Sequence, residues 1–228
     1  MKIKTEHLAR TLNAGAHPVY WLSGDEPLLL QESADQIRRH HREAGFADRE
    51  TYNVDRNFNW AHFRQSTGNL SLFAERKFVE LRLHQAKLED DGKLALADFL
   101  ETGARDLVIL ISSPKLESSV MQTKWFKSIE SRSVVIQVWP IDREGLPGWL
   151  ERRMLRANIH PEPDALQILI DRVEGNLLAA AQEIEKLKLL AGTNDTIKLD
   201  VQTVMQVVAD NSRYNAYQLV DAALLGNL

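Results

Sequence analysis

Short apolar runs alternate with longer amphipathic stretches from the N-terminal region to Pro140. The continuous apolar run Leu107–Ile111 is the strongest strand signal in the chain, and it is typical of a parallel sheet covered on both faces. Strands are also predicted at Val19–Ser23, Thr51–Val54, Phe78–Leu83 and Val134–Val138, and helices at 27–44, 60–67, 93–100 and 120–129. Because apolar and polar residues alternate through Phe78–Leu83, this strand is expected to bury one face. Strands that alternate with helices indicate an α/β domain with a mainly parallel sheet.

The pattern changes after Trp139 and Pro140. Helical periodicity continues, without a convincing long strand, at 146–158, 163–173, 176–191 and 201–208. We therefore predict a domain boundary near residue 140, followed by a small all-α domain. A further helix begins near Asn215 and still runs at Leu228, with an apolar face that nothing evident covers, so the chain looks truncated.

Composition is that of an ordinary soluble globular protein. Of 228 residues, 44% are hydrophobic and 26% are charged, and no apolar run approaches the ~20 residues that a membrane span needs. The N-terminal residues lead into no apolar segment of a secretory signal. The chain has no cysteine, which excludes disulfides, thiolate chemistry and cysteine-based zinc sites and suits a reducing compartment. We therefore expect a cytoplasmic protein.

The formal net charge of −4 argues against a dedicated duplex-DNA binder, which usually carries a basic excess. Any contact with DNA must then be local, or made together with partners. Two arginine clusters lie on predicted helices: Arg38, Arg39 and Arg42, and Arg152, Arg153 and Arg156. A solvated helix face is the favoured interpretation of both clusters, and whether they touch DNA stays open.

A strand, a glycine turn and a helix follow one another around Gly24, which is the setting of a nucleotide-binding P-loop. A P-loop has a second glycine five residues on, then Lys and then Ser or Thr, and these positions hold Leu29, Leu30 and Gln31. Asp25 and Glu26 would add negative charge beside a phosphate, and Pro27 has no N–H to donate. The scaffold is therefore that of a P-loop domain without its site. An ordinary strand–turn–helix is the alternative interpretation of this segment.

No other motif indicates catalysis or a bound metal. The chain has no Gly-x-Ser-x-Gly nucleophile elbow, and the adjacent pair His40 and His41 lacks metal-ligand spacing on a helix. These histidines are predicted to lie on a solvated helix face. We expect no catalytic residue, no cofactor and no metal site.

The segment Leu70-Ser71-Leu72-Phe73 is the most informative short stretch of the chain. It lies between a predicted helix and a predicted strand, next to the turn signal Gly68-Asn69. An apolar segment at a loop either packs into the core or is offered to a partner protein. The residues themselves leave both possibilities open.

Several segments together resemble the delta-subunit family of the bacterial DNA polymerase III clamp loader. The resemblance covers essentially the whole chain, and the Gly-Asn-Leu block combined with the degenerate P-loop is its most specific part. It rests on the following residues: Gly24–Ser33, Ser71–Ala74, Lys115 and Leu116, Trp125 and Phe126, Glu174–Ala179, and Glu183 with Lys186 and Leu187.

The resemblance implies an AAA+-like clamp-binding domain over 1–140, a helical lid domain over 141–210, and the first helix of a collar domain over 211–228. In this family a Leu-Phe pair inserts into a hydrophobic pocket of the sliding clamp. Carried onto this sequence, the pair is Leu72 and Phe73, and the expected clamp-binding residues are Leu70, Ser71, Leu72 and Phe73. Leu70 is a mild departure, because some relatives carry another apolar residue there.

The expected function is therefore that of a non-catalytic clamp-loader subunit, which binds and opens the DNA sliding clamp during replication without binding nucleotide. Its expected partners are the sliding clamp and, through the collar domain, the other loader subunits, with DNA contacted only weakly or within the complex and no membrane contact. Two alternatives remain. One is an ATP-binding AAA+ ATPase, which the missing P-loop lysine disfavours. The other is a DNA-binding adaptor that uses the arginine clusters, which the net charge disfavours.

Overall fold

The computed structural model describes residues 1–68, 76–102, 106–190 and 196–205. The chain divides into two compact units, Met1–Pro140 and Ile141–Leu228. In the first unit, helices and strands alternate as the sequence pattern predicts. Its elements are β1 (Lys2–Lys4), a 3-10 turn (Thr5–His7), α1 (Leu8–Ala14), β2 (Val19–Gly24), α2 (Pro27–Glu43), β3 (Asp48–Val54), α3 (Trp60–Gly68), β4 (Lys77–Leu83), α4 (Asp90–Thr102), β5 (Leu107–Ser113), α5 (Ser118–Met121), α6 (Lys124–Arg132) and β6 (Val134–Val138).

The strands of the first unit form a six-stranded sheet in the order β1-β6-β2-β5-β4-β3. Each pair in this sheet is parallel, so the carboxyl ends of the strands share one edge. The central strands β2 and β5 are buried almost throughout, as continuous apolar runs require. The predicted α/β fold with a parallel sheet is confirmed.

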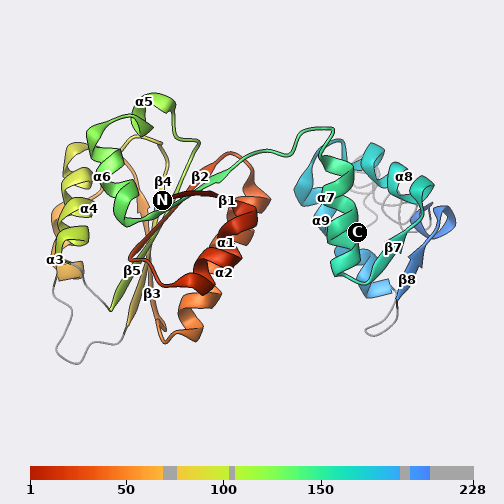
Figure 1. The fold of residues 1–228 in the computed structure, drawn as a ribbon, viewed down its shortest axis with the longest axis horizontal. Coiled ribbons are helices and arrows are strands. Elements are labelled where there is room, and N and C mark those ends of the chain that lie inside the picture. Colours follow the sequence, from red (N-terminus) through yellow and green to blue (C-terminus); the bar gives the residue numbers. More distant parts are fainter. Residues whose placement is uncertain (69–75, 103–105, 191–195, 206–228) are drawn as a thin grey trace, which may run out of the picture. The chain divides into compact units, whose positions relative to one another are not determined.

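Helices cover both faces of the sheet (Figure 1). Helices α1 and α2 pack on one face through Leu8, Leu12 and Ile37. Helices α3, α4 and α6 cover the other face, where Trp60, Phe63, Leu96 and Phe126 belong to a second buried cluster. Alternate residues of β2, β4, β5 and β6 contribute to the two clusters, which makes this unit a three-layered sandwich.

Side chains and a glycine fix the ends of several helices. Asn59 Oδ1 accepts a hydrogen bond from the His62 N–H at 2.9 Å and so caps the N-terminus of α3. Gly45 follows the end of α2 with φ of +93°, a conformation that glycine adopts without strain. The helix predicted over 120–129 is instead two helices, because Thr123 Oγ1 accepts from the Phe126 N–H at 3.2 Å and starts α6 afresh.

The second unit is mainly helical. It contains α7 (Leu146–Arg156), β7 (Ile159–Pro161), α8 (Pro163–Val173), α9 (Leu177–Leu190) and β8 (Ile197–Leu199), and residues 201–205 are helical. Strands β7 and β8 pair in parallel as a small two-stranded sheet, so the expectation of an all-α unit is wrong in this respect. Residues 206–228, which include the expected start of a collar domain, lie outside the described residues.

Within the described ranges, no helix is both long and apolar enough to cross a membrane.

Candidate functional site

The turn between β2 and α2 is closed by its own side chains. Asp25 Oδ1 accepts a hydrogen bond from the backbone N–H of Lys115 at 3.1 Å, which ties the turn to the segment after β5. Glu26 Oε1 accepts from the backbone N–H of Leu28 at 3.3 Å and caps α2, whose first residue is Pro27. A carboxylate of the chain therefore occupies the helix N-terminus at which a P-loop holds phosphate.

Gly24 is required here by close packing rather than by a ligand. A Cβ at this position would lie 2.1 Å from the carbonyl oxygen of Val138, its register neighbour on β6. No residue with a Cβ fits at that distance without moving the backbone. This glycine thus has a structural role that needs no phosphate.

The positions that would hold a nucleotide do not suit one. Leu29 and Leu30 are half-buried and pack against the cluster beneath α1 and α2, and Gln31 is exposed. Neither an ammonium group for the phosphates nor a hydroxyl for magnesium is present at these positions. The residues of this turn therefore do not fit a nucleotide.

The expected clamp-binding residues Leu70, Ser71, Leu72 and Phe73 lie outside the described residues. The elements on both sides of them are described. Helix α3 ends at Gly68, and β4 begins at Lys77. How these two elements are fixed determines what the segment between them can do.

Helix α3 is held on the sheet by an aromatic cluster. Trp60 and Phe63 are buried, and their ring centroids lie 5.7 Å apart. Tyr52 of β3 and Phe58 contact the same rings. Such edge-to-face pairs stabilise by about 0.5–1.5 kcal/mol each beyond area burial. The helix is therefore anchored firmly along its inner face.

Helix α4 packs closely against α3. A Cβ at Gly92 would lie 2.6 Å from Cζ2 of Trp60, so glycine permits this approach. The two helices enclose an open groove of about 390 Å³, which Arg64 and Asp98 bridge with an N–O distance of 2.5 Å. The other lining residues are Ala61, Gln65, Thr67, Ala95, Phe99 and Thr102.

The first residues of β4 are fixed as well. The Lys77 ammonium donates to Glu50 Oε1 at 2.7 Å, and the Tyr52 hydroxyl donates to Glu50 Oε2 at 2.7 Å. The hydrogen bond from Lys77, followed by that from Tyr52, lowers the pKa of Glu50, and the same bond to Glu50 raises the pKa of Lys77. Arg76 places its guanidinium over the Phe46 ring, 5.6 Å from the centroid, and donates to Ala44 O at 2.6 Å.

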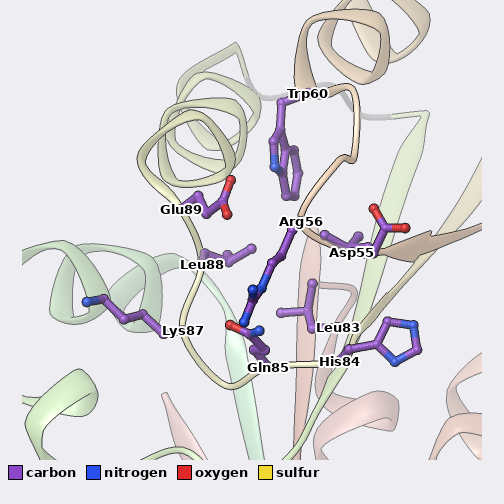
Figure 2. A pocket seen from close by; sticks show the side chains of 10 residues that line it. Asp55, Arg56, Trp60, Leu83, His84, Gln85, Lys87, Leu88 and Glu89 are labelled. Atoms are coloured by element: carbon purple, nitrogen blue, oxygen red, sulfur yellow. The ribbon is translucent and has the colours of Figure 1, made fainter.

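A second pocket, of about 260 Å³, lies at the carboxyl ends of β3 and β4, and sequence reasoning missed it (Figure 2). Trp60, Leu83 and Leu88 supply its apolar surface. Figure 2 shows the Arg56 side chain extending across it toward Gln85, whereas the side chains of His84 and Lys87 point away. Charged groups of both signs surround the pocket without converging on one point, so we assign no chemistry to it. The signal that was available is positional, because ligand sites in parallel sheets lie at this edge.

The two histidines at the end of α2 occupy different environments. His41 is fully buried among the rings of Tyr20, Phe46 and Phe78, so the prediction that both histidines lie on a solvated face is wrong for it. Burial, together with the neighbouring His40, lowers the pKa of His41 to about 4. Among the described residues, no group of three or more His, Asp or Glu side chains is placed to hold a metal ion.

The arginine clusters also divide. Arg38 is engaged by Glu80 of β4, whereas Arg39 and Arg42 are exposed. On α7, Arg153 lies over the Trp149 ring at 5.2 Å, and Arg152 and Arg156 are exposed. One arginine of each cluster is therefore tied into its own unit, and the other two of each cluster face solvent.

Comparison with known proteins places these features in one family. The family model "DNA polymerase III, delta subunit" matches residues 20–138. The DNA polymerase III subunit delta of Escherichia coli is 32% identical over 229 residues, which are 99% of this chain and 65% of that protein. The Haemophilus influenzae subunit delta is 29% identical over 231 residues, with the same two shares. The chain thus spans about 65% of the length of these curated relatives.

Solved structures agree on the fold. The Bacillus subtilis DNA clamp loader delta protein matches with a TM-score of 0.64 at 19% identity, over 86% of this chain and 60% of that one. The Thermotoga maritima RuvB Holliday junction branch migration motor matches with a TM-score of 0.50 at 12% identity, over 91% of this chain and 69% of that one. At these identities the likeness establishes the AAA+-like fold alone. With a family model that matches more than half of its residues, this chain belongs to the DNA polymerase III delta-subunit family.

Proposed function

We propose that this chain binds the DNA sliding clamp and opens it as a subunit of the clamp loader in DNA replication, without binding nucleotide. Membership of the delta-subunit family supports the role in replication. The sequence of residues 70–73 supports the binding step. Leu72 and Phe73 match the Leu-Phe pair that, in members of this family, inserts into a hydrophobic pocket of the clamp. The partners are then the clamp and the other loader subunits, and the place of action is the cytoplasm.

The observation that carries the proposal is the firm anchorage on both sides of this pair. Helix α3 is held by the buried rings of Trp60 and Phe63, and β4 is held at its start by the ion pair of Lys77 with Glu50. The two described elements that flank residues 69–75 are therefore fixed in the fold, and fixed flanking elements reduce the entropy that binding must overcome.

Opening of the clamp requires a rigid lever beside the anchor. We infer that α3 is this lever, because its inner face is fixed in the core and α4 supports it through the close contact of Gly92 with Trp60. When Leu72 and Phe73 hold the clamp, α3 would press on the neighbouring clamp surface. Binding energy alone supplies the work in this scheme, and the subunit catalyses no reaction of its own.

The AAA+ ATPase alternative is disfavoured by the β2–α2 turn. Glu26 caps the helix where phosphate would lie, and Leu29 and Leu30 face the core. A nucleotide would have to displace a carboxylate that the fold already holds.

The experiment is a direct measurement of binding to the cognate sliding clamp by surface plasmon resonance. Saturable binding is expected, and a synthetic peptide that spans residues 66–77 should compete with it. Opening is then followed with a fluorophore pair across the clamp's subunit interface, whose separation should rise when the chain is added. Absence of binding at tens of micromolar clamp would contradict the proposal, and binding without opening would contradict the role of α3.

A further inference from the structure

Four arginines line a groove between α2 and β3, the edge strand of the sheet. The groove measures about 300 Å³, and its charged residues are Arg38, Arg39, Arg42 and Arg49 together with Asp35. We call this groove, with its four arginines, the arginine groove. The strand order leaves β3 with a neighbour on one side only, so the groove runs along an open margin of the sheet.

Two of the arginines are positioned by one buried carboxylate. Glu80 of β4 is 3% exposed, and its Oε1 lies 2.6 Å from Nε of Arg38 and 2.8 Å from Nε of Arg49. Asp35, one turn earlier on α2, also pairs with Arg38. A charge buried in the sheet is retained only when it is paired, and here it fixes two guanidinium groups at the surface.

The other two arginines are available to a ligand. Arg39 and Arg42 are exposed on α2, three residues apart and therefore on neighbouring positions of one helix face. No carboxylate in the described part of the chain lies within ion-pair distance of either side chain. Their positive charge is directed to solvent.

The edge strand β3 adds polar side chains that can also contact phosphates. Residues alternate between the two faces of a strand, so Thr51 and Asn53 lie on the same face of β3 as Arg49, and both are exposed. Arg82, the register partner of Asn53, lies on this face too, with its guanidinium 3.7 Å from Glu80. Arginine, threonine and asparagine are among the side chains that contact the phosphates of nucleic acids.

The lack of exposed apolar side chains in the groove favours a nucleic acid over an acidic protein as its ligand. An interface between proteins is usually anchored by a buried apolar or aromatic side chain. The large exposed apolar residues of the described chain lie elsewhere, and Phe46 and Phe78 beneath the groove are buried. An exposed ring on which single-stranded bases could stack is absent from the residues that line the groove.

We propose that the arginine groove binds the phosphate backbone of duplex DNA, independently of the clamp-binding segment. Arg39 and Arg42 contact phosphates, Arg38 and Arg49 are held in register by Glu80, and Thr51 and Asn53 extend the contact along β3. The net charge of −4 does not oppose this local contact, because four arginines face only two carboxylates within it.

The test is fluorescence anisotropy of a labelled 30-base-pair duplex titrated with the chain at several salt concentrations. The variant Arg39→Ala, Arg42→Ala should weaken binding at least about tenfold and reduce the slope of log affinity against log salt by about 0.9 for each phosphate that is no longer neutralised. The control Arg152→Ala, Arg156→Ala removes the same charge from α7 and should leave the affinity within about twofold of the parent. Both variants change exposed side chains, and matching melting temperatures establish that they fold.

Three results would overturn the inference. The first is equal weakening by the two double variants, which indicates unspecific attraction. The second is tighter binding of a 30-nucleotide single strand than of the duplex. The third is displacement of the duplex by polyglutamate at equal charge concentration, which assigns the groove to an acidic protein surface instead.

Discussion

The carboxylate of Glu26 accepts a hydrogen bond from the backbone N–H of Leu28 at 3.3 Å, so α2 begins with an anion from its own chain. The N-terminus of a helix attracts negative charge, and here that attraction is already used. Asp25 places a second carboxylate beside it by accepting from the Lys115 N–H. A triphosphate at this turn would meet two like charges, and Leu30 stands at the position where a P-loop has its lysine.

We predict that the chain binds no ATP. A millimolar ligand with micromolar affinity stabilises a folded protein by ~4 kcal/mol, which thermal unfolding detects easily. Melting curves with and without Mg-ATP should therefore superimpose. A clear rise of the melting temperature with nucleotide would favour the ATPase alternative.

Substitution of Gly24 should damage the fold rather than any ligand contact. In Gly24→Ala the new Cβ would lie 2.1 Å from the Val138 carbonyl oxygen, so β2 and β6 must separate locally. We expect a loss of about 1–3 kcal/mol in the free energy of unfolding, as for other overpacked sites. Urea denaturation measures this loss.

A glycine with a yielding neighbour is the control for Gly24. At Gly148 in α7, a Cβ would meet only the end of the Arg152 side chain, at 3.1 Å. Gly148→Ala should be neutral or stabilise by up to about 1 kcal/mol, because alanine favours the helix. Equal effects of the two substitutions would refute the packing explanation.

His41 should make the fold sensitive to mild acid. The buried imidazole has a pKa of about 4 in the folded state against 6.5 when solvated, and neither ring nitrogen has a hydrogen-bond partner in the described structure. Below pH 6.5 the unfolded chain binds a proton that the folded chain cannot, so stability falls as the pH falls. The loss should reach about 3 kcal/mol near pH 4 and vanish above about pH 7.

The contribution of His41 is isolated by substitution. His41→Leu should lose less stability than the parent between pH 6.5 and about 4, measured by denaturation at each pH. His160→Gln changes an exposed histidine of β7 and should retain the parent profile. If His41→Leu also keeps the parent profile, the imidazole is not the acid-sensitive group.

Glu80 should contribute more to stability than its neighbour Asp35, although both pair with Arg38. Glu80→Gln leaves three guanidinium groups, of Arg38, Arg49 and Arg82, without their buried counter-charge, and because these arginines are partly or largely exposed we expect a loss of about 1–3 kcal/mol. Asp35→Asn breaks an ion pair near the surface and should cost under about 1 kcal/mol. Urea denaturation of both variants measures the two losses. A larger loss of stability in Asp35→Asn than in Glu80→Gln would contradict the burial argument.

The main elements of the fold could be predicted because their patterns are long and internally consistent. The apolar run of β5 and the long amphipathic stretch of α2 are examples. Strand β1 and strands β7 and β8 could not be found, since each has three residues and forms only through pairing with a distant partner. Helix α1 was missed for a related reason: its buried face consists of Leu8, Thr11 and Leu12, too few positions for a periodic signal.

The burial of Glu80 shows another limit of pattern reasoning. The alternation of apolar and polar residues predicted that Phe78–Leu83 buries one face. Because β4 lies between β3 and β5, it also buries Glu80 on the opposite face. The two arginines nearest to Glu80 come from α2 and β3, distant in sequence, and no local pattern indicates such a pairing. For the same reason the arginine groove appears in sequence only in part, as the cluster from Arg38 to Arg42.

The affinity of Leu72→Ala, Phe73→Ala for the cognate sliding clamp is the most direct measurement, with the melting temperature of the same protein as its companion. A buried Leu or Phe anchor contributes roughly 1.5–3 kcal/mol, so the double variant should bind at least ~100-fold more weakly. Its melting temperature should stay near the parent value, and the control Leu178→Ala, Leu189→Ala, which removes two exposed leucines of α9, should bind normally. Unchanged clamp affinity, or a collapsed melting temperature that reveals the pair as core, would contradict the assignment.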